Sequence, residues 1–280
     1  MGGALAAYFD KIEETDRTLT PIDEVEALFE SRAHRFDEIE ATAASIALDP
    51  DGHPPSGRQA AARAAAEAEL GSLIERIIAD QDQVETAPAR ARARRALTDY
   101  AARAILVPMQ DFAPRAAELG YDVEAIAQEI GLDVDTICHR LTALPRQEGV
   151  PCFGYFQANA AGTIVEMHGL PGLMLPRYAA ACPLWVLFRA QQSPEALMRQ
   201  RVVFPSGARF VFLAVAHQAG PSGFGKPRHY RTGMIALSEA DAALTVYAPD
   251  AGVPVEEVGP TCRICPRRGC PHRVDDPLSS

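Results

Sequence analysis

The sequence predicts an α+β protein in which a helical N-terminal half precedes a mainly antiparallel, strand-rich half and a cysteine-rich tail. Apolar residues repeat at helical spacing as far as about residue 145, and short β-branched and aromatic runs follow it, separated by Gly, Pro and Asn. Helices and strands do not alternate along the chain, which argues against a doubly wound sheet. We expect a helical region over residues 1–90, and a region over residues 91–280 that holds a helix pair, a strand-rich core and the tail.

Composition restricts the class of protein. The chain has 280 residues, 48% of them hydrophobic, which is enough to bury a real core. Its net charge of −10 opposes non-specific attraction to DNA phosphates. Neither a secretory leader nor an apolar run of about 18 residues is present, so we expect a cytoplasmic protein with no membrane crossing. In that compartment the six cysteines are thiols or metal ligands rather than disulfides.

The N-terminal helices are predicted from caps and breakers. Thr20-Pro21 has the pattern of a helix start, because Thr is a good cap and proline suits the first turn. A loop rich in Pro and Gly follows over residues 49–57. Helices are then expected over residues 58–79 and 91–106, and their weak apolar stripes indicate paired surface helices.

Two short helices joined by a glycine turn are predicted between Asp122 and Leu141. Apolar residues recur at helical spacing on both sides of Gly131. The pattern resembles a DNA-reading helix-turn-helix. However, the segment offers four acidic residues beside only two residues that could meet DNA phosphates or bases, His139 and Arg140. We therefore favour a purely structural helix pair.

The period changes to that of strands after Pro145. Hairpins are expected, with turns at residues 159–162 and 205–207. The predicted strands cover residues 152–156, 163–167, 202–204, 209–217 and 232–237.

The strongest chemical signal is the C-x2-C-x4-C spacing of Cys262, Cys265 and Cys270. Three thiols within nine positions can converge on one metal centre, and the neighbouring arginines favour the thiolate form. Structural zinc and an iron–sulfur cluster fit this spacing equally well. The fourth ligand has to come from a further side chain, and Cys182 is favoured because Pro183 and Trp185 would shield a cluster; the other candidates are Cys138, Cys152 and His272.

Other motifs are weak. The sequence has no H-E-x-x-H, G-x-S-x-G or phosphate-binding glycine loop, which disfavours a hydrolase. The histidines are scattered, and only His272 has neighbours of the kind that bind metals, so we expect core or surface roles for the others. We favour a plain loop for Gly223-Phe-Gly225. The residues behind it could still meet the phosphates of an anionic ligand; they are Lys226, Arg228, His229 and Arg231.

Several short motifs together resemble the short-chain fatty acyl transcriptional regulator family. The resemblance extends from about Arg95 to Arg273, with a weaker echo in residues 20–27. Its motifs are Ile137-Cys-His-Arg-Leu141, Gly149-Val-Pro151, Ala181-Cys-Pro-Leu-Trp185, Tyr230-Arg-Thr-Gly233 and the cysteine tail.

The resemblance implies a non-enzymatic bacterial sensor that binds acyl-coenzyme A and adjusts transcription of propionate, acetate or glyoxylate metabolism genes. It implies a degenerate metallopeptidase-like middle region and DNA binding only through a helix-turn-helix head, which is not found before Thr20. It also implies a [4Fe–4S] cluster on the cysteines that correspond to Cys182, Cys262, Cys265 and Cys270.

We expect the acyl-CoA pocket between the helical and strand-rich parts. Its candidate apolar walls are Phe153, Phe156 and Trp185, and its candidate phosphate partners are Arg140, Lys226, Arg228 and Arg231. The alternative is a structural zinc module in an interaction protein that binds no small ligand. Homodimerisation is expected only because dimers are common among regulators.

Overall fold

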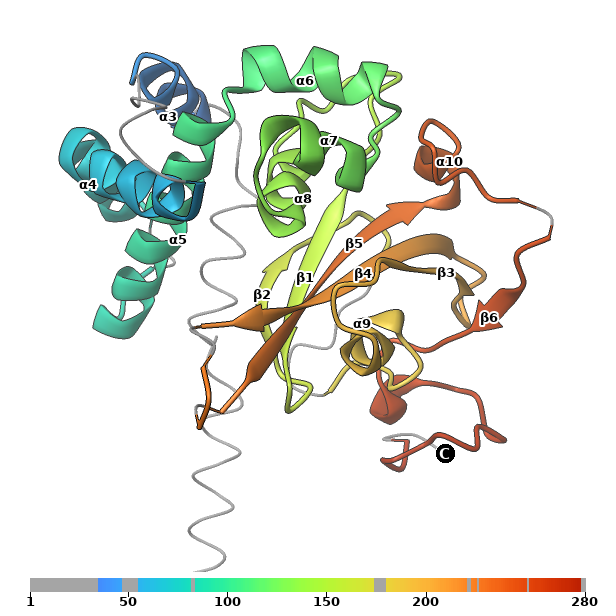
Figure 1. Ribbon diagram of the computed structural model, residues 1–280. Coiled ribbons are helices and arrows are strands. Elements are labelled where there is room, and N and C mark those ends of the chain that lie inside the picture. The colour runs from blue at the N-terminus through green and yellow to red at the C-terminus, as the bar shows by residue number, and fades with distance from the viewer. Residues whose placement is uncertain are drawn as a thin grey trace, which may run out of the picture.

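A computed structural model describes residues 35–46, 55–81, 84–173, 180–220, 223–225, 227–250 and 252–277. Helices form the first part and a sheet forms the second, so the predicted α+β class is confirmed (Figure 1). The helix expected to begin at Thr20 lies outside the described residues. No helix within the described ranges is both long and apolar enough to cross a membrane.

Three helices form the N-terminal layer: α3 (Arg35–Ala43), α4 (Pro55–Ala79) and α5 (Ala87–Leu106). The expectation of surface helices is wrong, because α4 and α5 pack together around a buried core. Much of that core is alanine, which gives a weak apolar stripe in the sequence but lets two helices approach closely. Ala62, Ala66, Ala93 and Ala101 have no exposed surface. The division expected near residue 90 stays a prediction.

The expected helix pair is confirmed as α7 (Val123–Ile130) and α8 (Val134–Thr142). Gly131 ends α7 with a φ of 72°, a left-handed conformation that glycine adopts without strain. Asp122 and Asp133 cap the two helices by accepting hydrogen bonds from backbone amides of the first turn. A further helix, α6 (Met109–Glu118), precedes the pair and was not expected.

The C-terminal half forms one six-stranded sheet in the order β2-β1-β5-β4-β3-β6. Every neighbouring pair is antiparallel except β3 and β6, which are parallel. The short β6 was not predicted, and the turns at residues 159–162 and 205–207 are present. The strands are β1 (Gly154–Asn159), β2 (Ile164–His168), β3 (Met198–Val203), β4 (Arg209–Ala219), β5 (His229–Ser238) and β6 (Val255–Glu257).

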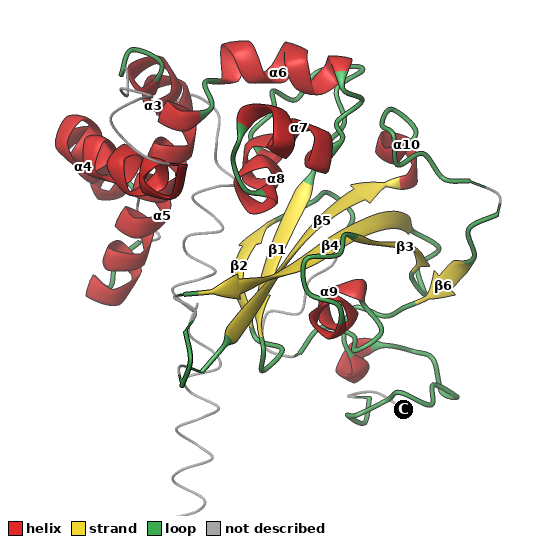
Figure 2. Cartoon of the chain, in the orientation of Figure 1, coloured by secondary structure: helices red, strands yellow, loops and turns green. Residues whose placement is uncertain are grey.

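Alternating side chains of the sheet enter two different cores. Tyr155 and Ile235 pack with α7 and α8, whereas Phe156 and Met234 pack with α9 (Val186–Arg189) on the opposite face. Figure 2 shows the helix pair and α9 on opposite sides of the strands. The short α10 (Glu239–Ala242) follows β5.

A buried ion pair joins α8 to the N-terminal layer. The guanidinium of Arg140 donates two hydrogen bonds to the Glu40 carboxylate, at 2.8 and 3.0 Å. The hydroxyl of Tyr100 donates to the same carboxylate, and Arg140 lies over the Tyr100 ring at 5.8 Å from its centroid. The Arg140 side chain is 1% exposed, so Glu40 is the group that balances its charge.

Removing this ion pair should destabilise the protein strongly. We expect Arg140→Met to lower the free energy of unfolding by about 3–5 kcal/mol, because it leaves the Glu40 carboxylate uncompensated at a buried site. Arg76→Met is the matched control, since Arg76 of α4 pairs with Glu38, which lies on α3 as Glu40 does, but both side chains are more than half exposed. Its cost should not exceed about 1 kcal/mol. Urea unfolding measures the free energy of unfolding of both variants. Equal losses in the two would contradict the larger contribution of the Arg140–Glu40 pair.

Candidate functional site

The tail cysteines lie beside the loop that carries Cys182. The Cys182 amide donates to the Pro260 carbonyl at 3.0 Å, which holds this loop against the start of the tail. The thiols of Cys262 and Cys265 are close enough to interact electrostatically with that of Cys182. Cys182, Cys262 and Cys265 are buried, and Cys270 is half-buried.

Backbone amides point at the Cys182 sulfur. Burial raises the pKa of the Cys182 thiol, and hydrogen bonds from the backbone of Gly259 and Leu184 act in the opposite direction. Such amides favour the thiolate, which is the form of cysteine that ligates metals. The Cys182 thiol therefore lies beside backbone donors that stabilise its thiolate form.

Gly259 makes the closest approach to the cysteines. A Cβ at this position would lie 2.9 Å from the Cys265 sulfur, so only glycine fits without a shift. The Gly259 carbonyl accepts a hydrogen bond of 2.9 Å from the Trp185 indole. The Arg273 guanidinium donates to the carbonyls of Cys262 and Cys265 at 2.7 and 2.9 Å, which fixes the loop between them.

A large polar cleft lies between the helices and the sheet. Two cavities of about 840 and 860 Å³ form it, the first bordered by α4, α5 and the loop before α8, the second by β1, β2, β4 and β5. The cavities adjoin each other, because they share the lining residues Asp99, Arg103, Asp135, His217 and Gln218. A separate cavity of about 280 Å³ lies beyond α8 and is lined by Leu141, Phe153 and His168 among others.

Of the expected phosphate partners that the structure describes, only Arg231 lines this cleft. Arg231 lines the cavity of about 860 Å³ and donates to the Gln157 side chain at 3.3 Å. Arg228 is exposed and lines none of these cavities. Arg140 is occupied by Glu40, and Lys226 lies outside the described residues. The cleft supplies instead Arg63 and Arg103, which were not expected.

The three expected apolar walls are distributed over both faces of the sheet. Phe153 lines the cavity of about 280 Å³ and packs against Tyr121. Phe156 and Trp185 lie in the core on the opposite face, with ring centroids 6.2 Å apart. Trp185 is therefore beside the cysteines, and the structure does not bring it together with Phe153.

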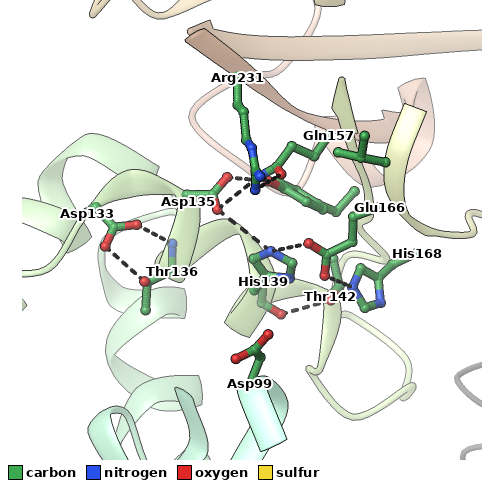
Figure 3. Close-up of polar contacts among 12 residues, drawn as sticks. Asp99, Asp133, Asp135, Thr136, His139, Thr142, Gln157, Glu166, His168 and Arg231 are labelled. Carbon is green, nitrogen blue, oxygen red and sulfur yellow. Dashed lines mark hydrogen bonds and ion pairs between the residues drawn. The ribbon is translucent and has the colours of Figure 1, made fainter. Parts of the chain in front are cut away.

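A cluster of two histidines and a glutamate was missed by the sequence analysis. His139 of α8 faces Glu166 and His168 of β2, and one potential ligand atom of each lies within 4.8 Å of the other two (Figure 3). The expectation that every histidine except His272 lacks such neighbours is wrong. The spacing of Glu166 and His168 places both side chains on one face of a strand, and this could have been recognised in the sequence. The sequence does not show that His139, about 27 residues earlier, lies beside them.

Electrostatics at this cluster favour a neutral imidazole beside a charged carboxylate. Burial lowers the pKa of His139 well below its usual range, and the charge of Arg103 acts in the same direction. Burial by itself raises the pKa of Glu166, but the two histidines and Arg103 outweigh it, so the pKa of this carboxyl lies below its usual range. Burial raises the pKa of the nearby Asp135, which accepts a hydrogen bond from Tyr155.

Two family models match the chain. One, described as the short-chain fatty acyl coenzyme A regulator C-terminal domain, matches residues 142–280. The other, an IrrE N-terminal-like domain, matches residues 25–142. The two matches meet at the end of α8.

Curated relatives and a solved structure agree with these matches. The chain is 34% identical over 203 residues to a propionyl-CoA carboxylase regulator of Cereibacter sphaeroides, covering 71% of this chain and 44% of the relative. It is 33% identical over 212 residues to the HTH-type transcriptional regulator PrpR of Mycobacterium tuberculosis, covering 72% and 42%. The chain thus spans about half the length of the curated relatives it matches. A solved Mycobacterium tuberculosis transcriptional regulator has a TM-score of 0.80 at 25% identity, covering 93% of this chain and 95% of that one.

The close approach of Gly259 to Cys265 yields a stability prediction. Gly259→Ala should lower the free energy of unfolding by about 1–3 kcal/mol, because the added methyl overpacks a buried contact. Gly269→Ala in the same tail is the control, since a Cβ there meets nothing within 4 Å, and its effect should stay below about 0.5 kcal/mol. Urea unfolding followed by the fluorescence of Trp185, the single tryptophan, measures both changes. An unaffected Gly259→Ala protein would show that this contact is not tight.

Proposed function

Because the chain belongs to the short-chain fatty acyl coenzyme A regulator family, we propose that it is the acyl-CoA-responsive, iron–sulfur-containing sensor portion of a bacterial transcriptional regulator of short-chain fatty acid metabolism. The observation that carries this proposal is the family match over residues 142–280, which includes both the cleft-lining strands and the cysteine tail. In this proposal the protein is cytoplasmic and not an enzyme. A separate head domain contacts DNA, as the names of the relatives suggest for those proteins.

The cysteine site suits an iron–sulfur cluster. Cys182, Cys262, Cys265 and Cys270 would hold it, and the cluster would supply a redox-sensitive link between the tail and the sheet. Amide donors at Cys182 and the missing side chain at Gly259 support a bulky anionic group at this position. Arg273 would keep the Cys262 and Cys265 loop in its conformation.

Structural zinc is the alternative, and the same four cysteines would hold it. A tetrahedral zinc ion with bonds of about 2.3 Å to sulfur draws its thiolates to about 3.8 Å from one another. A [4Fe–4S] cluster holds its four thiolates around a larger centre, so metal analysis separates the two proposals.

The cleft between the helices and the sheet is the proposed acyl-CoA site. Its adjoining cavities of about 840 and 860 Å³ are large enough for an extended nucleotide thioester, whereas the cavity of about 280 Å³ is not. Arg103 and Arg231 would meet the phosphates, because guanidinium groups bind phosphate oxygens in a bidentate manner; Arg63 is ion-paired with Asp99.

A ligand in this cleft would act by favouring one arrangement of the helices on the sheet. The cleft is bordered by α5 and the start of α8 on one side and by β4 and β5 on the other. A ligand shifts a conformational equilibrium only through its different affinity for the two states. The walls of the cleft belong to both the helical part and the sheet, so its affinity for a ligand depends on how these two parts are arranged. A head domain and a second copy in a homodimer could respond to that arrangement.

Anaerobic purification followed by a visible spectrum and analysis of iron, sulfide and zinc tests the cluster. We expect broad visible absorbance and about four irons per chain, both lost in Cys265→Ser because one of four thiolate ligands is removed. Cys152→Ser is the control, since Cys152 is half-buried and lies outside the tail, and it should retain the iron. Stoichiometric zinc without colour would favour the structural module, and the absence of any bound metal would reject a metal centre.

Titration calorimetry with propionyl-CoA and acetyl-CoA tests the cleft. Arg231→Ala should weaken binding about ten- to a hundredfold, because a charge-assisted hydrogen bond to phosphate contributes about 1.5–3 kcal/mol. Arg228→Ala is the control: Arg228 is three residues away, carries the same charge and lines none of the cavities. Equal weakening in both variants would indicate a general charge effect, and binding of neither thioester would reject the proposal.

A further inference from the structure

The cluster of His139, Glu166 and His168 is separate from the cysteine site and has the composition of a metal centre. His139 Nε2 is 3.6 Å from one Glu166 carboxylate oxygen, and His168 Nε2 is 3.3 Å from the other. The His139 and His168 rings are nearly perpendicular, with centroids 5.2 Å apart. Both histidine side chains are less than 10% exposed, so the carboxylate lies between two buried imidazoles.

Each ligand is held by regular structure. His139 lies in the last turns of α8, next to Arg140, whose ion pair fixes the helix. Glu166 and His168 are two residues apart on β2, which places both side chains on the same side of the strand. Side chains on helices and strands keep their positions better than side chains on loops, which favours a preformed site.

The distances suit a single divalent transition ion. Zinc with bonds of about 2.0–2.2 Å to nitrogen and oxygen needs ligand atoms about 3.4 Å apart. The two separations to Glu166 are already 3.3 and 3.6 Å. Two imidazoles and one carboxylate are also a ligand set that zinc uses when a fourth position stays open.

A purely structural role leaves a buried polar atom without a partner. In that alternative, His168 hydrogen-bonds Glu166, and the His139 ring packs against the rings of Tyr155 and His168, with centroids 4.2 and 5.2 Å away. His139 Nε2 then has no hydrogen-bond partner among the described residues although it is buried. Leaving such an atom unsatisfied costs about 1–3 kcal/mol. An ion at the cluster would remove this cost.

We propose that His139, Glu166 and His168 bind one zinc-like divalent cation at the wall of the cleft between the helices and the sheet. Glu166 lines the cavity of about 860 Å³ and His168 lines the cavity of about 280 Å³, so the ion lies between the two spaces. Asp135 Oδ2 lies 3.8 Å from His139 Nε2 on the side of the larger cavity (Figure 3). A fourth ligand would be water or an oxygen atom of a molecule bound in the cleft.

This site differs from the metal site of a peptidase helix. The helix α4 of the IrrE-like part has no H-E-x-x-H motif and no histidine. The three proposed ligands come instead from α8 and β2, on either side of residue 142, where the two family matches meet. The proposal does not depend on the cysteine tail or on acyl-CoA binding.

Titration of the EDTA-treated full chain with Co²⁺, followed by visible spectroscopy, tests the site. We expect one equivalent to bind with nitrogen and oxygen ligand bands and to be displaced by one equivalent of Zn²⁺. Any thiolate charge-transfer absorption would come from the cysteine tail. Glu166→Gln keeps the size of the side chain and should weaken Co²⁺ binding at least about a hundredfold, because loss of even a second-shell partner costs 10- to 100-fold. His168→Gln should behave in the same way.

Two controls separate this site from the rest of the molecule. His217→Gln removes a histidine that lines the cleft but lies outside the cluster, and it should bind Co²⁺ normally. Cys265→Ser disables the tail site and should also retain the bands, which separates this proposal from the iron–sulfur proposal. Absence of non-thiolate Co²⁺ bands in the parent chain would overturn the inference, as would equal binding by Glu166→Gln.

Discussion

The buried pairing of Arg140 with Glu40 is the constraint on which the rest of this structure depends. It fixes α8 to the N-terminal helices, while the neighbouring His139 points to Glu166 on the sheet. Arg140 and His139, which are adjacent on α8, thus contact the N-terminal helices and the sheet respectively. The cleft, which is bordered by both parts, exists because α8 keeps them at this separation.

Polar groups inside the fold are arranged as a connected set rather than as isolated pairs. Asp135 accepts a hydrogen bond from Tyr155, and the Gln157 side chain links Tyr155 to Arg231. This chain extends from the first turn of α8 to the open side of the cleft. A buried network of this kind is costly when one partner is missing, so a charged ligand at Arg231 would affect groups as far as α8.

The sheet connects the cleft to the cysteine site. Tyr155 and Phe156 are consecutive on β1, and alternation places them on opposite faces. Tyr155 belongs to the polar network near the cleft, whereas Phe156 packs against Trp185. The Trp185 indole donates a hydrogen bond to the carbonyl of Gly259, which lies beside Cys265. A shift of β1 would therefore be felt at both sites through side chains already in contact.

The sequence by itself determined the α+β class, the helix pair around Gly131, the main strands and the close-spaced cysteines, because these depend on local period, turns and spacing. Tertiary structure decided what depends on long-range contact. Alanine-rich helices proved to be buried, since close packing of small residues leaves little periodic signal. Arg140 pairs with Glu40 of α3 rather than lining the cleft. His139 lies beside Glu166 and His168, because folding brings α8 next to β2.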